Sequence, residues 1–171
     1  MLKQRGAYDK KRSNLFITLF LVACSGQGVL LRQDLENWFG APEKIEIHYE
    51  GEKYTISKDD ESYSQMMSLL NKKILSTYKP STADCDFDIC ELESVKQNGL
   101  AVELIYSKEM NADIVCGTDI IKRRYNRLLM PLTGDLRNLI FFGNPDIGGN
   151  ALGDFEKNDA LIDYINQFTQ G

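Results

Sequence analysis

Lys44-Ile45-Glu46-Ile47-His48-Tyr49 is the stretch of this 171-residue chain that decides the fold, because its polar and apolar residues alternate. Alternation with a period of two puts the apolar side chains on one face of a β-strand. Tyr54 and Ile56 repeat the pattern after residues 50–52, which predicts a β-hairpin. One-sided alternation is typical of an antiparallel sheet with one packed and one solvated face, so His48, the single histidine, is expected on the solvated face.

A long amphipathic helix is predicted to follow the hairpin. Ser57 and Asp60 form a capping motif, and apolar residues then recur every three or four positions over about 20 residues, up to Pro80. A second amphipathic helix is predicted near the C-terminus, capped by Asp154 or Asn158. Each apolar stripe must be buried, so both helices are expected to cover the sheet.

Further strands are predicted in the second half of the chain. The predictions are a strand over 100–106 after the turn Asn98-Gly99, a hairpin partner over 94–97, a loop over 111–117, strands over 125–132 and 136–142, and a long turn over 144–150. Residues 128–130 and 139–142 are apolar at consecutive positions, which indicates strands covered on both faces. The chain therefore predicts an α+β fold, with an antiparallel sheet of about five to six strands and two to three helices packed on it.

A secretory signal is predicted at the start of the chain. Residues 10–12 are basic, and residues 15–22 form an apolar run broken only by Thr18. A transmembrane helix needs about 20 apolar residues, so this run is too short to remain as a membrane span.

The end of this signal, Leu21-Val22-Ala23-Cys24, resembles the lipobox of bacterial lipoprotein signal peptides. The resemblance implies a signal peptide over 1–23, cleavage before Cys24, lipid attachment at Cys24 and acylation with palmitate-like chains. Two or more acyl chains form a stable anchor, so the membrane is the expected partner. Ser25 also resembles the pattern sorted to the outer membrane of diderm bacteria, whereas a monoderm source offers only the plasma membrane.

The rest of the chain is expected to contain an anchor segment over 24–43 and a single α+β domain over 44–171. Removal of residues 1–23 takes away five of the 20 basic and one of the 25 acidic residues, which changes the net charge from −5 to −9. An acidic domain lacks the basic face that nucleic acid requires, so no nucleic-acid partner is expected.

Residues 30–39 are predicted to form a short amphipathic helix that ends at Gly40. Two roles are open for its aromatic residues. Trp38 and Phe39 either pack on the domain that follows or dip into the membrane interface beside the lipids. The polar face mixes acidic and basic residues, which favours packing on the domain.

Residues 84–95 contain a pattern that resembles a calcium loop. Asp84, Asp86 and Asp88 take the first, third and fifth positions, but Ile89 replaces the glycine at the sixth and Val95 the glutamate at the twelfth. The alternation also fits a short strand. No metal or other cofactor is therefore predicted.

Three cysteines remain after lipidation of Cys24. Outside the cytoplasm, two of Cys85, Cys90 and Cys116 are expected to pair, and the sequence leaves open which two.

Lys122, Arg123, Arg124 and Arg127 form the main basic cluster of the acidic domain. They are either an anion-contacting site, for a ligand or a lipid headgroup, or a solvated strand end. The second interpretation is favoured, because no glycine-rich loop accompanies the cluster.

The sequence predicts no enzyme, because a single histidine and the absence of a nucleophile motif leave little for catalysis. The predicted function is that of a membrane-anchored lipoprotein of the bacterial cell envelope, a binding or envelope-structural module whose partner is an envelope protein. The alternatives are a carboxylate-dependent extracytoplasmic enzyme and a calcium-stabilised binding module.

Overall fold

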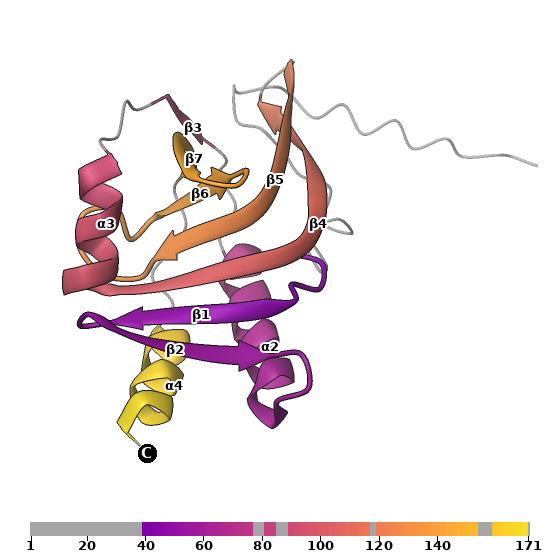
Figure 1. Cartoon of the computed structure of the whole chain (residues 1–171). Coiled ribbons are helices and arrows are strands. Elements are labelled where there is room, and N and C mark those ends of the chain that lie inside the picture. The colour runs from indigo at the N-terminus through magenta and orange to yellow at the C-terminus, as the bar shows by residue number, and fades with distance from the viewer. Residues whose placement is uncertain (1–38, 77–80, 85–88, 117–118, 154–158, 171) are drawn as a thin grey trace, which may run out of the picture.

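The computed structural model describes residues 39–76, 81–84, 89–116, 119–153 and 159–170 (Figure 1). In chain order the elements are β1 (Lys44–Tyr49), β2 (Glu52–Ser57), α2 (Glu61–Ser76), β3 (Ser81–Asp84), α3 (Ile89–Asn98), β4 (Leu100–Cys116), β5 (Asp119–Pro131), β6 (Leu139–Gly143), β7 (Ile147–Gly153) and α4 (Asp159–Gln170). None of the helices in these ranges is long and apolar enough to cross a membrane.

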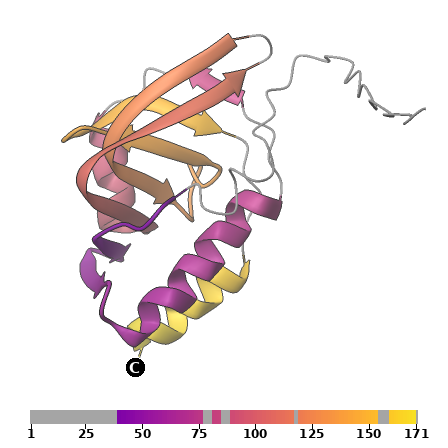
Figure 2. The ribbon, with the colours of Figure 1, turned by 90° about the vertical axis from the view of Figure 1, so that its right-hand side faces the viewer.

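The seven strands form one sheet in the order β2-β1-β4-β5-β6-β7-β3, and every neighbouring pair is antiparallel. The predicted α+β fold with an antiparallel sheet is confirmed, with one strand more than expected. The long β4–β5 hairpin curves through the centre of the sheet (Figures 1 and 2).

Helices cover both faces of the sheet. α2 and α4 lie side by side on one face, as Figure 2 shows, and they bury the large core to which Ile45, Ile47 and Leu161 belong. α3 covers the other face, where Leu92 packs with Ala101 and other small or apolar side chains. The predicted solvated face is therefore wrong for the part of the sheet that α3 covers.

The central strands are buried on both faces, as predicted. In β5, Leu128 and Met130 belong to the large core, whereas Leu129 belongs to the smaller core under α3. In β6, Phe141 likewise points to the α3 side and Phe142 to the other. The consecutive apolar residues therefore correctly predicted strands that are covered on both faces.

The segment that leads into β1 is held by two tyrosines. The Tyr106 hydroxyl donates to the carbonyl oxygen of Phe39 over 2.7 Å, and the Tyr63 hydroxyl donates to that of Pro42, also over 2.7 Å. The Phe39 side chain is fully buried in the large core. The alternative that Phe39 dips into a membrane is therefore wrong, and its packing on the domain is confirmed. Trp38 and the rest of the predicted 30–39 helix lie outside the described residues.

The predicted hairpin around Asn98-Gly99 is wrong, because residues 94–97 belong to α3. Leu92 and Val95 are three residues apart and face the smaller core together, which a helix allows and a strand does not. The Gly99 amide donates to the Val95 carbonyl over 3.0 Å and closes the end of the helix. Asn-Gly serves helix ends as well as hairpin turns, so the dipeptide alone did not decide between them.

Three other boundaries differ from the sequence prediction. The predicted loop over 111–117 is strand as far as Cys116, and the predicted turn over 144–150 contains the start of β7. The strand predicted along the aspartates ends at Asp84, and Ile89 already begins α3. In each case the backbone N–H and C=O groups find hydrogen-bond partners through pairing with a distant strand or through a packed helix. Local side-chain patterns do not encode such distant partners.

We predict that Tyr106→Phe destabilises the domain by about 1 kcal/mol, because the buried Phe39 carbonyl loses a donor while the ring packing stays. Chemical denaturation measures the difference. Tyr49→Phe is the matched control, since its half-buried hydroxyl makes no hydrogen bond within the described residues, and equal losses in the two variants would contradict the prediction.

A second prediction concerns Lys73, which shares the buried stripe of α2 with Met66 and Leu70 and is 1% exposed. Burial lowers the pKa of Lys73 to about 8 from 10.5. The unfolded chain then binds more protons between these values, so wild type should gain about 2 kcal/mol over Lys73→Met as pH rises from 7 to 10. A pH-independent difference would contradict this, and exposed Lys72→Met serves as the control.

Candidate functional site

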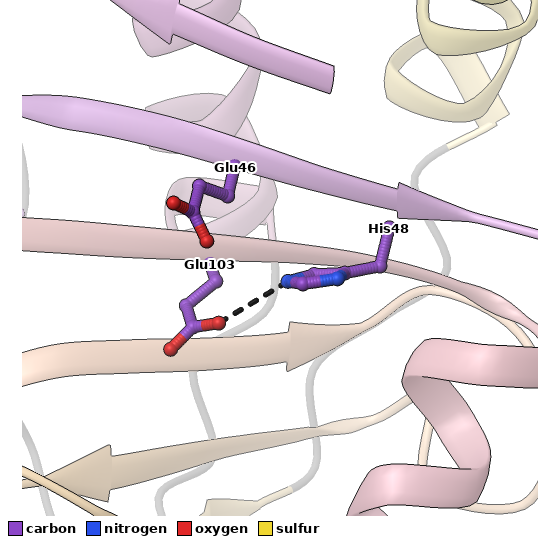
Figure 3. A group of neighbouring side chains, drawn as sticks. All are labelled: Glu46, His48 and Glu103. Atoms are coloured by element: carbon purple, nitrogen blue, oxygen red, sulfur yellow. Dashed lines mark hydrogen bonds and ion pairs between the residues drawn. The ribbon is translucent and has the colours of Figure 1, made fainter. Parts of the chain in front are cut away.

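Two glutamates and the histidine converge on the sheet face under α3. Glu46 of β1 lies opposite Glu103 of β4 in the antiparallel register, and His48 follows two residues along β1. Side chains two apart on a strand share a face, so the three lie on the same side. Figure 3 shows them turned toward one another, with one ligand atom of each residue within 4.8 Å of the others.

Glu103 is the centre of this cluster, and its side chain has no solvent exposure. One carboxylate oxygen, Oε2, lies 3.2 Å from His48 Nε2 and 3.3 Å from Lys96 Nζ. The other, Oε1, lies 2.7 Å from Arg127 Nε. A single buried carboxylate thus links β1, α3 and β5 to β4.

The ion pair between Glu103 and Arg127 is close but poorly directed. At 2.7 Å the two atoms attract strongly, yet neither Arg127 Nε nor Glu103 Oε1 makes an aligned hydrogen bond. The contact therefore stabilises by charge, and part of the hydrogen-bonding capacity of both groups is unused.

Glu46 has its own cations at the open side of the cluster. Lys44 Nζ donates to Glu46 Oε1 over 2.7 Å, and Lys53 Nζ lies 3.5 Å from the same oxygen. Both lysines are more than a third exposed, so this half of the cluster borders solvent.

Both glutamates are held in the ionised form. Burial alone would raise the pKa of Glu103, but the hydrogen bond with His48 and the charges of Lys96 and Arg127 outweigh it and lower the pKa below 4.5. Burial would also raise the pKa of Glu46, and Lys44 and Lys53 reverse the shift in the same way. Neither carboxylate is therefore a proton donor near neutral pH.

Comparison with known proteins identifies no relative of this chain. No family model, curated protein or solved structure matches the chain.

The donor set of Glu46, His48 and Glu103 resembles that of a divalent metal centre, but its surroundings do not fit one. Lys96 and Arg127 already neutralise Glu103, and two lysines neutralise Glu46. A metal ion would have to displace or approach these positive charges at close range, which costs Coulomb energy in a buried place. The arrangement is therefore a buried ion-pair network, and we assign it no metal.

The structure divides the predicted basic cluster. Arg127 belongs to the ion-pair network, whereas Lys122 and Arg124 are exposed on the outer half of β5. Arg124 Nη1 lies 3.7 Å from Glu109, an exposed pair of the kind that contributes little. Arg123 alternates with these two along the strand and is half-buried.

Most of the remaining predicted site residues lie outside the part of the chain that the structure describes. Cys24 and Cys85 lie outside the described residues, while Cys90 in α3 and Cys116 in β4 are described only in their backbone. Their pairing stays a prediction. For the calcium pattern, α3 starts at Ile89, so its sixth to twelfth positions form a helix instead of a ligand loop.

Sequence reasoning placed His48 at the surface and missed its partners. His48 is only 12% exposed, because α3 covers this part of the sheet. The available signal was Glu103 itself, a charged residue between the apolar Val102 and Leu104 in a predicted strand. A charge in the middle of an apolar run indicates either an exposed face or a buried pair, and only the topology decides which.

We predict that Glu103→Gln destabilises the domain by about 2 kcal/mol, because Lys96 and Arg127 lose their buried counter-charge. Glu109→Gln is the matched control, since it removes an exposed partner of Arg124 and should cost about 0.5 kcal/mol or less. Similar losses in both variants, measured by chemical denaturation, would show that the network contributes no more than a surface pair.

The comparison of wild type with Glu103→Gln also gives a prediction for the dependence of stability on pH. Since the folded pKa of Glu103 lies below 4.5, its contribution is complete above about pH 4.5 and is lost as pH falls through the folded pKa. The stability difference between wild type and Glu103→Gln should therefore shrink as the pH falls below about 4.5. A difference that grows in acid contradicts the lowered pKa.

Proposed function

We propose that this chain is a lipid-anchored protein of the bacterial cell envelope whose α+β domain is a non-catalytic binding module. The observation that carries the anchor is the sequence Leu21-Val22-Ala23-Cys24, with its basic flank and short apolar core. The buried Phe39 is only 39 − 24 = 15 residues along the chain from Cys24. Fully extended, this stretch of chain reaches at most about 50 Å, which keeps the domain close to the membrane.

The binding role is supported by the chemistry of the buried network. Its two carboxylates are ionised and neutralised by neighbouring cations, which leaves neither a free general acid nor an open metal position there. A group that must accept or release a proton near neutral pH needs a pKa near that range. The network instead joins α3 to three strands and makes a rigid scaffold, on which loops and rim side chains can bind an envelope partner.

We predict that Cys24→Ala abolishes membrane retention. Wild-type protein purified from membranes should have the mass of residues 24–171 plus acyl chains, and the variant should lack both the acyl mass and the cleavage. Cys90→Ala is the matched control, because it removes a cysteine away from the signal and should leave the acyl mass unchanged. A wild-type mass equal to that of the unmodified full chain would refute the lipoprotein proposal.

A further inference from the structure

Arg127 has more hydrogen-bonding capacity than the protein uses. Its guanidinium carries five N–H donors, and its contact with Glu103 is close but unaligned. The two terminal nitrogens have no hydrogen-bond acceptor among the described residues, and the side chain is 33% exposed. The guanidinium of Arg127 is therefore held by Glu103 at Nε, while its terminal N–H groups are left without an acceptor in the described part of the chain.

Lys96 borders the same carboxylate from α3. Its Nζ lies 3.3 Å from Glu103 and 3.7 Å from Glu93, and its side chain is 17% exposed. Around Glu103, one buried negative charge thus faces two partly exposed positive charges. Glu93 is 58% exposed, and its carboxylate, 3.7 Å from Lys96, offsets part of this positive charge.

The wider network carries no negative excess, unlike the chain as a whole. Its ion pairs join the acidic Glu46, Glu93 and Glu103 to the basic Lys44, Lys53, Lys96 and Arg127. Lys96 and Arg127 balance Glu93 and Glu103, and the additional positive charge lies with the two lysines at Glu46. Because the whole chain has a net charge of −5, the network repels an anion less than the rest of the chain does.

The geometry points to an oxyanion-binding site formed by Arg127 and Lys96 and oriented by Glu103, which takes the carboxylate or phosphate group of a small soluble ligand. An arginine fork matches the two oxygens of either group, and a neighbouring lysine adds a point charge. Glu103 touches no ligand here and acts as a positioning residue. The inference deepens the binding role proposed above by naming the chemical class of ligand.

A direct test is to titrate the protein with inorganic phosphate and, separately, with acetate. The full chain is used, purified from whichever cell fraction contains it. Chloride holds the ionic strength constant, so general screening does not change. The readout is the arginine Nε–H resonance that is absent from the spectrum of Arg127→Lys. We expect the chemical shift of this resonance to change until it saturates. The anion that binds with the higher affinity shows whether phosphate or carboxylate is the preferred group.

Arg127→Lys keeps a positive charge beside Glu103 but loses the fork, so affinity should fall about tenfold. Lys96→Gln leaves the Arg127 resonance visible and should weaken binding several-fold, which keeps the test informative if the first variant is unstable. Arg124→Gln is the matched control, because it removes an exposed arginine on the outer half of β5 and should leave affinity unchanged.

A resonance that does not move at all, or that moves linearly without saturation, would overturn the site. So would a loss of affinity in Arg124→Gln equal to that in Arg127→Lys, which would show only nonspecific attraction. These outcomes are separable from the anchor. Unmodified Cys24 with intact phosphate binding refutes the lipoprotein proposal alone, and lipidated protein without binding refutes the oxyanion site alone.

Discussion

A carboxylate without solvent exposure in the middle of a sheet is the constraint on which the rest of this structure depends. Glu103 must be neutralised where it lies, since an unpaired buried charge costs several kcal/mol. Its counter-charges come from α3 and β5, so the helix is fixed against the sheet by Lys96 and the central hairpin by Arg127. The position of α3 is thereby set by electrostatics as well as by Leu92 and its apolar neighbours.

The same carboxylate explains why the sheet pairs in a single register. Glu46 and Glu103 face each other across β1 and β4, and a slip of β1 by one residue would turn Glu46 into the large apolar core, away from Lys53. Like charges opposite each other oppose pairing on their own. Here the lysines beside Glu46 and the cations of Lys96 and Arg127 beside Glu103 neutralise both carboxylates, so the pairing is tolerated.

The sequence predicted the parts of this fold that depend on local pattern. The alternation in β1, the long stripe of α2 and the consecutive apolar residues of β5 and β6 each led to the correct element. α3 was missed because Asn98-Gly99 ends helices as readily as it turns hairpins. The outer half of the β4–β5 hairpin was missed because residues 111–116 owe their strand conformation to pairing with β5. The ion-pair network could not be predicted for a similar reason, since Lys96 and Arg127 meet Glu103 only after three elements, α3, β4 and β5, have assembled.

Stability alone does not account for so many charges at one buried place. Apolar side chains of similar volume often make an equally stable or more stable core, so an ion-pair network is weak evidence of a purely stabilising role. A register-fixing role explains Glu103 and the lysines that neutralise Glu46. It does not explain why the terminal nitrogens of Arg127, a side chain that is 33% exposed, have no hydrogen-bond acceptor in the described part of the chain. An anion that completes the hydrogen bonds of Arg127 accounts for this, and it would leave the scaffold that Glu103 assembles unchanged.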